Sequence, residues 1–340
     1  MRGLGRSSTF PFPQYIADDE HETVYFDEGL GRTLVLVHGL GANCTNWEPI
    51  VRILAPRCRL VGLDLVGCGW SRKPDVRYTV DLLRDHLLGF LERRGIGRAT
   101  LIGHSMGGAV VIAAALAQPS LAEGLVLIDA AGVSRLPLWM RLGAGVALHR
   151  ALLLPALGLG AGLILDNVFV DAPRENRNVR WFREASLRDG PLLPNLRDFA
   201  RVSESLCRDI VRRDYSGELL RIDAPVLAIW GECDKLTTLG CGDRLEGLRR
   251  LRTVVLERCG HMPMVERPEE TAFCIERFLD APPGGTPDRD DARGTRSTLA
   301  PDSRTTGGAA QVWWPIRYRT MNSAAPSMTR SSSNSPSGLP

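Results

Sequence analysis

The stretch LIGHSMGGAV, residues 101–110, runs from apolar residues into a serine flanked by glycines. Gly103, Ser105 and Gly107 form the pattern G-x-S-x-G, placed where an apolar run predicts a strand and the small residues after it predict a helix. A sharp turn at this junction forces strained backbone angles on the serine and leaves no room for side chains at the two glycines. The pattern therefore predicts that the Ser105 hydroxyl stands above the edge of a sheet as a nucleophile.

Short β-rich runs and longer helical patterns alternate around this stretch. Such alternation is typical of an α/β fold with a mostly parallel sheet. Residues 22–39 are expected to form a hairpin that leads into a buried strand at 33–37. Further strands are expected at 59–65, 99–103, 124–129, 224–231 and 252–258, and helices at 79–95, 107–118 and 268–279, with Pro268 in the first turn of the last.

The alternation divides the chain into four parts. Residues 1–19 are expected to be an N-terminal lead, and residues 20–132 together with 221–280 the α/β core. Residues 133–220 have helical patterns and no convincing strand, which predicts a helical cap over the carboxyl ends of the sheet. The tail at 281–340 is rich in Pro, Gly, Ser and Arg and is expected to be disordered, although VWWPIRY at 312–318 is an apolar patch that could dock.

Charge and composition exclude several partners. The net charge of +3 comes entirely from residues 281–340, so no basic surface indicates a nucleic-acid partner. The most apolar run, at 151–165, is shorter than the ~20 residues of a spanning helix, so no stable membrane insertion is expected. The eight cysteines are scattered without a C-x-x-C pair, and no secretory leader is visible, which predicts a cytoplasmic protein with reduced thiols.

A serine hydroxyl needs a base, and His261 is the best candidate. It stands on a loop directly after the last predicted strand, from which it could reach Ser105. His104 adjoins the serine but is expected to point away from it by strand alternation. The other histidines lie in the lead, at an early strand end, in a helix and in the insertion: His21, His38, His86 and His149.

The base needs a carboxylate partner, for which two residues compete. Asp234 follows the penultimate strand and is the first choice, whereas Asp129 ends a strand at the same edge and is the alternative. Cys233 and Cys259 are near these positions and are expected to be buried thiols. An oxyanion hole needs two backbone N–H donors, and Met106 and Leu40 are expected to supply them.

These segments together resemble the α/β-hydrolase superfamily over roughly residues 20–280. The matching pieces, in order, are VLVHGLG, DLVGCGWSRKP, LIGHSMGGAV, PVLAIWGECDK and GHMPMVERPEE. The resemblance implies an eight-stranded sheet with a helical cap and a triad of Ser105, Asp234 and His261. It departs from the family at Thr238, where a proline is often found.

The expected function is a cofactor-free serine hydrolase that cleaves a carboxylic ester of a small to medium apolar substrate through an acyl-enzyme. Hydrolysis of carbon–carbon bonds in ring-cleavage products and haloperoxidase-like perhydrolysis are alternatives, because the same residues support them. A ligand-binding relative without turnover is the alternative from another class. No metal-ligand cluster or nucleotide motif appears, so neither metal nor cofactor is expected, and the oligomeric state stays open.

Overall fold

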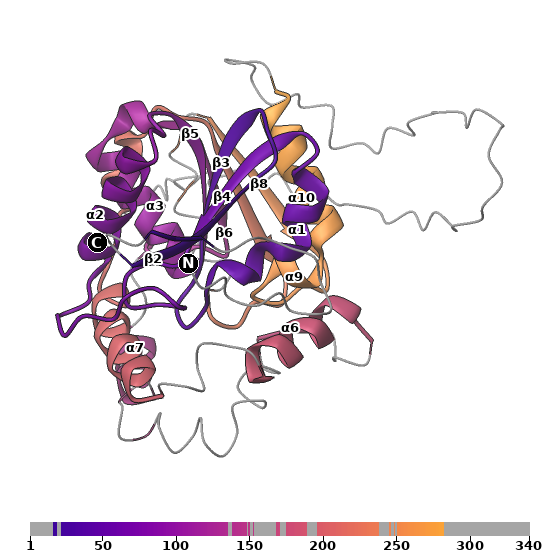
Figure 1. Ribbon diagram of the computed structural model, residues 1–340. Coiled ribbons are helices and arrows are strands. Elements are labelled where there is room, and N and C mark those ends of the chain that lie inside the picture. The colour runs from indigo at the N-terminus through magenta and orange to yellow at the C-terminus, as the bar shows by residue number, and fades with distance from the viewer. Residues whose placement is uncertain are drawn as a thin grey trace, which may run out of the picture.

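The structure is a computed structural model, shown in Figure 1. It describes residues 16–18, 22–134, 138–147, 149, 152, 168–170, 175–188, 196–237, 245, 248 and 250–281. The predicted tail lies outside the described residues apart from Ala281, and so do Thr238 and most of the predicted lead and of the apolar run at 151–165.

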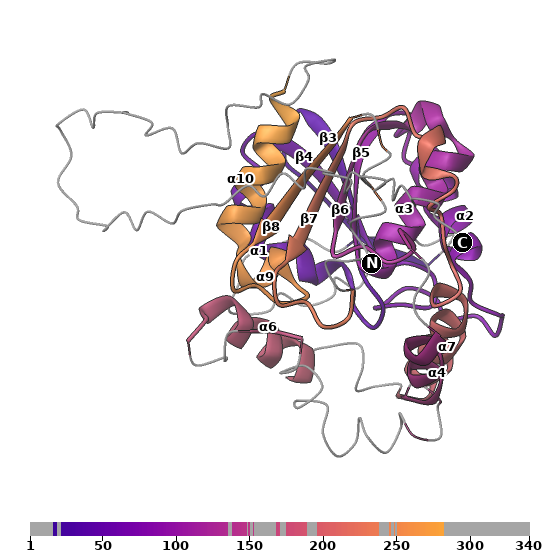
Figure 2. The same ribbon diagram turned by 180° about the vertical axis from the view of Figure 1, so that it is seen from behind.

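An eight-stranded sheet forms the centre of the described chain (Figures 1 and 2). The strand order is β1-β2-β4-β3-β5-β6-β7-β8, and all neighbours from β4 onward run parallel. Only β1 and β2, at one edge, are antiparallel to their neighbours. The bounds are β1 Ile16–Asp18, β2 Thr23–Glu28, β3 Arg32–Val37, β4 Cys58–Leu63, β5 Ala99–His104, β6 Ala122–Ile128, β7 Val226–Gly231 and β8 Leu251–Leu256. The predicted mostly parallel α/β sheet is therefore confirmed.

The predicted hairpin between β2 and β3 is wrong. The two strands are joined by a short turn, but β4 lies between them, with Tyr25 paired to Leu63 on one side and Leu34 paired to Leu60 on the other. Both edges of β3 are paired in parallel, one with β4 and the other with β5, so no edge is left for β2. The actual hairpin partner of β2 is β1, which lies within the segment predicted as a lead.

Helices cover both faces of the sheet. In Figure 1, α2 and α3 lie on one face, and α1 and α10 lie on the other with the short α9 beside them. Each face has its own buried apolar cluster, because alternate residues of the central strands, such as Val35 and Leu36, point to opposite sides. The bounds are α1 Glu48–Leu54, α2 Val80–Arg93, α3 Met106–Ala117, α9 Pro263–Glu266 and α10 Pro268–Leu279, with 3-10 turns at η1 Cys44–Trp47, η2 Pro119–Leu121 and η3 Leu219–Arg221.

The ends of these helices follow the signals in the sequence. Thr79 caps α2 by accepting a hydrogen bond from the Leu82 N–H at 3.2 Å, and the chain leaves the helix at Gly95 with φ of 67°. Pro268 occupies the first turn of α10, where its missing N–H costs no hydrogen bond. The predicted helices at 79–95 and 268–279 are confirmed to within a residue or two at each end.

The inserted segment contributes helices near the carboxyl ends of the strands. Its described helices are α4 Leu138–Ala147, α6 Arg177–Arg188 and α7 Leu196–Ile210. Figures 1 and 2 place them at one end of the sheet, and α7 reaches the loop after β4, where Ser205 accepts a hydrogen bond from the Tyr78 N–H at 2.9 Å. No strand occurs among the described residues of 133–220, and the division into core and cap stays a prediction.

The structure bears on the predictions about membrane insertion and about the cysteine thiols. Among the described helices, none is both long and apolar enough to cross a membrane. The described cysteines are free thiols, and Cys259 is buried as expected. The expectation of a buried thiol is wrong for Cys233, which is exposed because it stands in the turn after β7 with the neighbouring Asp234 facing inward.

Candidate active site

The candidate nucleophile sits in a strained turn between β5 and α3. Ser105 has φ of 51° and ψ of −117°, a conformation that a residue other than glycine rarely adopts. Hydrogen bonds hold it there, because the Ser105 N–H donates to Ile128 O and the Ser105 carbonyl accepts from the N–H groups of Gly108 and Ala131, each at 2.9 Å. The surrounding backbone thus fixes the turn that the sequence predicts.

The glycines of the motif are required by space. A Cβ at Gly103 would lie 2.4 Å from Gly107 O, and one at Gly107 would lie 2.1 Å from Val37 O. Both distances are too short for any side chain to be accommodated without moving the backbone. The predicted steric role of the two glycines in G-x-S-x-G is confirmed.

The structure brings the candidate base and acid together. His261 follows β8 and Asp234 follows β7, and the His261 Nδ1 lies 2.9 Å from the Asp234 Oδ2. Both residues are buried, which shields their interaction from water. An Nδ1–H that donates to the carboxylate leaves Nε2 as the basic nitrogen of the imidazole.

The surroundings of Asp234 favour its charged form. Burial alone raises the pKa of a carboxyl group, but hydrogen bonds from His261 and Thr237 and from the Leu236 N–H outweigh it and hold the pKa of Asp234 below its ordinary value. The Leu236 N–H lies 2.7 Å from Oδ1 and the Thr237 hydroxyl 2.6 Å from Oδ2. Asp234 is therefore ionised at neutral pH.

The alternative acid, Asp129, lies beside this pair but faces a different partner. Its Oδ1 accepts a hydrogen bond from the Gly231 N–H at 2.9 Å, whereas the Nδ1 of His261 pairs with Asp234. Burial, followed by the charge of Asp234, raises the pKa of Asp129 well above its ordinary value, so its surroundings favour the protonated carboxyl.

These three residues also form the one group of potential metal ligands among the described residues. Ligand atoms of Asp129, Asp234 and His261 lie within 4.8 Å of one another. A cation there would have to break the hydrogen bond between His261 and Asp234 and bind a carboxyl whose raised pKa disfavours its charged form, so the arrangement fits proton transfer better than metal binding.

One residue that sequence reasoning set aside supports the candidate base. His104 is buried, its Nε2 lies 2.7 Å from the His261 carbonyl oxygen, and the two rings are 4.9 Å apart. Burial, together with the nearby His261 ring, lowers the pKa of His104 to about 3, so it is neutral. Nothing in the sequence indicates this contact, because His261 lies on a loop far from His104 in the chain.

The loop after β3 passes close to Ser105. A Cβ at Gly39 would lie only 3.2 Å from the Ser105 Cβ, so Leu40 follows at the edge of the site. His38 braces this loop, because its Nδ1 lies 2.8 Å from Gly39 O while its Nε2 accepts from the Leu65 N–H at 3.1 Å.

The two candidate oxyanion donors have no competing backbone partner. Met106 is the first residue of α3, where an N–H has no acceptor within its own helix. The Leu40 N–H makes no backbone hydrogen bond to any residue that the structure describes. Within the described part of the chain, no backbone oxygen competes with a ligand for either N–H.

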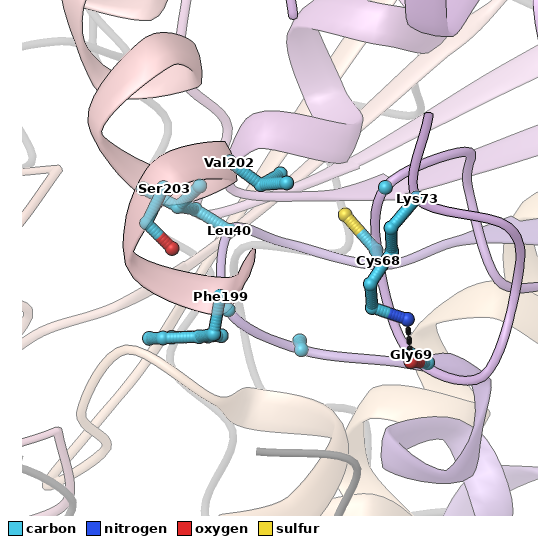
Figure 3. A pocket seen from close by; sticks show the side chains of 10 residues that line it. Leu40, Cys68, Gly69, Lys73, Phe199, Val202 and Ser203 are labelled. Atoms are coloured by element: carbon cyan, nitrogen blue, oxygen red, sulfur yellow. Dashed lines mark hydrogen bonds between the residues drawn. The ribbon is translucent and has the colours of Figure 1, made fainter. Parts of the chain in front are cut away.

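A pocket adjoins this loop (Figure 3). We call it the Lys73 pocket; it is lined by Leu40, Gly41, Ala42, Gly67, Cys68, Gly69, Lys73, Phe199, Val202 and Ser203. In Figure 3 the side chains from α7 face the Lys73 loop across the pocket. Sequence reasoning missed this pocket because its walls come from three segments far apart in the chain.

The chain belongs to the Alpha/beta hydrolase family, whose model matches residues 34–272. It is similar to the 2-hydroxy-6-oxo-6-(2'-aminophenyl)hexa-2,4-dienoic acid hydrolase of Metapseudomonas resinovorans, with 26% identity over 274 residues, 76% of this chain and 87% of that protein. It is also similar to the pimeloyl-acyl-carrier-protein methyl ester esterase of Nitrosomonas europaea, with 29% identity over 265 residues, 73% of this chain and 96% of that protein.

A solved structure gives the same assignment. The structure of a membrane phospholipase A, described as a bacterial virulence factor, superposes with a TM-score of 0.63 and 31% identity, covering 78% of this chain and 84% of that one. The relatives named here thus include a hydrolase of a dienoic acid, an ester hydrolase and a phospholipase. They support hydrolysis as the reaction and differ in the bond and the substrate.

Proposed function

We propose that this protein is a serine hydrolase that cleaves a carboxylic ester of a small to medium substrate through an acyl-enzyme. The hydrogen bond of 2.9 Å between His261 and Asp234 is the observation that carries the proposal, because it joins a buried base to an ionised acid. The strained turn at Ser105 supports it, since a serine held in such a conformation at a helix N-terminus is the usual form of this nucleophile.

The proposed reaction has two halves. In the first, His261 Nε2 takes the proton of the Ser105 hydroxyl while its oxygen attacks the ester carbonyl, and the proton then passes to the leaving alcohol. In the second, His261 takes a proton from water, whose oxygen attacks the acyl carbonyl. The bond between the acyl carbon and the Ser105 Oγ then breaks, His261 returns the proton to that oxygen, and the acid is released. Asp234 holds the imidazole in the required tautomer and stabilises its positive charge in both halves.

The proposed oxyanion hole consists of the N–H groups of Leu40 and Met106. Each would donate to the carbonyl oxygen as it becomes negative, and the N-terminus of α3 adds a favourable dipole. The support for this role is that neither N–H has a backbone acceptor among the described residues and that the Gly39 backbone lies against Ser105.

A reactive fluorophosphonate probe and a panel of esters of graded chain length test the proposal. The wild type is expected to bind the probe covalently and to hydrolyse at least one ester, and Ser105→Ala is expected to do neither. Ser120→Ala is the matched control, because Ser120 is exposed in η2 at the opposite end of β6. Inactivity of the wild type towards both probe and esters would overturn the proposal.

Carbon–carbon bond hydrolysis is the second candidate. The observation that favours it is the similarity to the dienoic acid hydrolase of Metapseudomonas resinovorans. A ring-cleavage dienoic acid is coloured, so its loss of absorbance measures this activity beside the ester panel. A kcat/KM for the dienoic acid well above that for every ester would favour this reaction, and binding without turnover of either would favour a ligand-binding relative.

A further inference from the structure

The walls of the Lys73 pocket are apolar except at a few positions. Leu40, Phe199 and Val202 supply apolar surface, and the polar side chains are the Lys73 ammonium and the Ser203 hydroxyl. The Cys68 thiol adds no charge, because burial raises its pKa to about 12. Pockets of this kind use their few polar groups to orient a ligand, so a single cation decides which ligand fits.

The pocket adjoins the proposed site around Ser105. Leu40 belongs to both, since its N–H is a proposed oxyanion donor and its side chain lines the pocket. Gly39, one residue earlier, is close enough to the nucleophile that a Cβ there would lie 3.2 Å from the Ser105 Cβ. On the far side, Phe199 of α7 approaches Gly41, where a Cβ would lie 3.2 Å from its ring. The pocket therefore lies beside the position that we propose for the reacting carbonyl.

Lys73 has unused capacity to bind an anion. Its Nζ donates to the carbonyl oxygens of Gly69 at 2.6 Å and Ser71 at 3.0 Å, which leaves one of its three protons (Figure 3 shows the bond to Gly69). It makes no ion pair with a carboxylate in the described part of the chain. Burial lowers the pKa of Lys73, so its charge is partly desolvated and gains from an anion nearby.

The acidic residues nearest to Lys73 are engaged elsewhere. Asp64 accepts hydrogen bonds from the N–H groups of Cys44 and Trp70, each at 2.7 Å. Asp198 of α7 forms an ion pair with Arg201 at 3.2 Å. Both raise the pKa of Lys73 and so help to keep it charged, but neither occupies the pocket as its counter-ion.

We propose that the Lys73 pocket binds a carboxylate carried by the substrate, and that Lys73 is the residue that selects it. The proposal rests on the proposed function and narrows it to esters with an anionic end, with an apolar stretch between the ester and the carboxylate that matches the walls of Leu40, Phe199 and Val202. Lys73 is then a specificity-determining residue that takes no part in the chemical steps.

A matched pair of esters tests this selectivity. The mono-p-nitrophenyl ester of suberic acid and p-nitrophenyl octanoate have the same chain length and differ in a terminal carboxylate. The wild type is expected to prefer the suberate ester in kcat/KM, mainly through KM. Lys73→Met is expected to reduce this preference by about 10-fold or more, since a hydrogen bond to a charged group contributes that much to binding.

Two variants control for other effects. Arg72→Met removes an exposed cation from the neighbouring position of the same loop and is expected to keep the wild-type preference. Lys73→Gln keeps a donor for the Gly69 carbonyl but has no charge, so it replaces Lys73→Met if the methionine variant does not fold. If the folded Lys73→Met or Lys73→Gln variant keeps the wild-type preference for the suberate ester, the proposal is overturned. Lys73 would then serve only to stabilise its own loop.

Binding separates failure of this inference from failure of the proposed function. The suberate monoester is titrated calorimetrically into Ser105→Ala, with and without Lys73→Met. About 10-fold weaker binding without the lysine supports the carboxylate site even if the wild type hydrolyses no ester. Equal affinity, or no binding to Ser105→Ala, contradicts it even if the wild type is an active esterase.

Discussion

Two buried aspartates lie at the carboxyl ends of neighbouring strands, and their pKa values are shifted in opposite directions. Asp234, after β7, receives hydrogen bonds from His261, Thr237 and the Leu236 N–H, which hold its pKa below the ordinary value. Asp129, after β6, has the Gly231 N–H as a donor and the negative charge of Asp234 close by, and its pKa is raised. Burial is common to both, so the donors and the neighbouring charge decide the direction in which each pKa is shifted.

The Thr237 hydroxyl contacts both aspartates, one through its side chain and the other through its backbone. The Thr237 hydroxyl oxygen lies 2.6 Å from the Asp234 Oδ2 and 2.8 Å from the Asp129 carbonyl oxygen. A hydroxyl has one proton, so it can donate to only one of these oxygens at a time. Thr237 thus links the loop after β7 to the backbone of Asp129 and also stabilises the Asp234 carboxylate.

The largest expected effect comes from Asp234→Asn. The amide cannot hold the His261 imidazole in the required tautomer, so kcat for the best ester is expected to fall about 10⁴-fold with little change in melting temperature. Steady-state kinetics on the purified variant measure it. A loss of less than about 10-fold would reverse the comparison and make Asp129 the functional acid.

A smaller loss is expected for Thr237→Val, which keeps the shape of the side chain and removes its hydroxyl. The carboxylate of Asp234 then loses a charge-assisted hydrogen bond, and kcat is expected to fall roughly 10-fold. Thr271→Val serves as the control, because Thr271 is also a buried threonine but lies in α10, away from the site. Similar kinetics for the two variants would show that the Thr237 hydroxyl has no special role.

Asp129→Asn is expected to change activity least, by about 3-fold or less, because the His261 Nδ1 pairs with Asp234 and the raised pKa of Asp129 favours a neutral side chain. Its effect appears instead in stability against pH. A raised folded pKa means that the folded state keeps a proton that the unfolded chain loses above about pH 4, so this residue lowers stability as the pH rises from there towards its folded pKa.

Thermal unfolding between about pH 4 and about pH 7 checks this sign. The difference in melting temperature, variant minus wild type, is expected to grow with pH, because asparagine does not titrate. Asp234 makes the free energy of unfolding depend on pH in the opposite direction. Its lowered pKa stabilises the fold above about pH 4, and that stability is lost as the pH falls through the folded pKa. This contribution is the same in the wild type and the variant, so it cancels in the difference. A constant difference across this range would mean that Asp129 is ionised in the folded protein.

Local sterics explain why much of this site could be predicted from the sequence. The turn at Ser105 is dictated by residues within two positions of it, and the glycines there have backbone within 2.4 Å of a missing Cβ. Asp234 and His261 each directly follow a strong strand pattern, and parallel strands bring such positions to one edge. Placing Asp234 and His261 at that edge requires only the direction of the strands and the apolar pattern that predicts them.

Features that depend on distant neighbours could not be predicted in the same way. Both edges of β3 need partners, but nothing in its own residues indicates that β4 separates it from β2. The contact of His104 with the His261 carbonyl joins residues 157 positions apart. The exposure of Cys233 depends on the orientation of the turn after β7, in which the neighbouring Asp234 side chain is buried.

The backbone of His261 is bound at both of its polar groups, and by different parts of the protein. Its carbonyl oxygen is held by His104 of the sheet, and its N–H donates to Val168 O of the inserted segment at 2.9 Å. Exchange of that segment for one from another hydrolase, a common route to altered substrate range, would therefore also remove an anchor of the imidazole. A working chimaera should keep an acceptor at position 168, whatever sequence surrounds it.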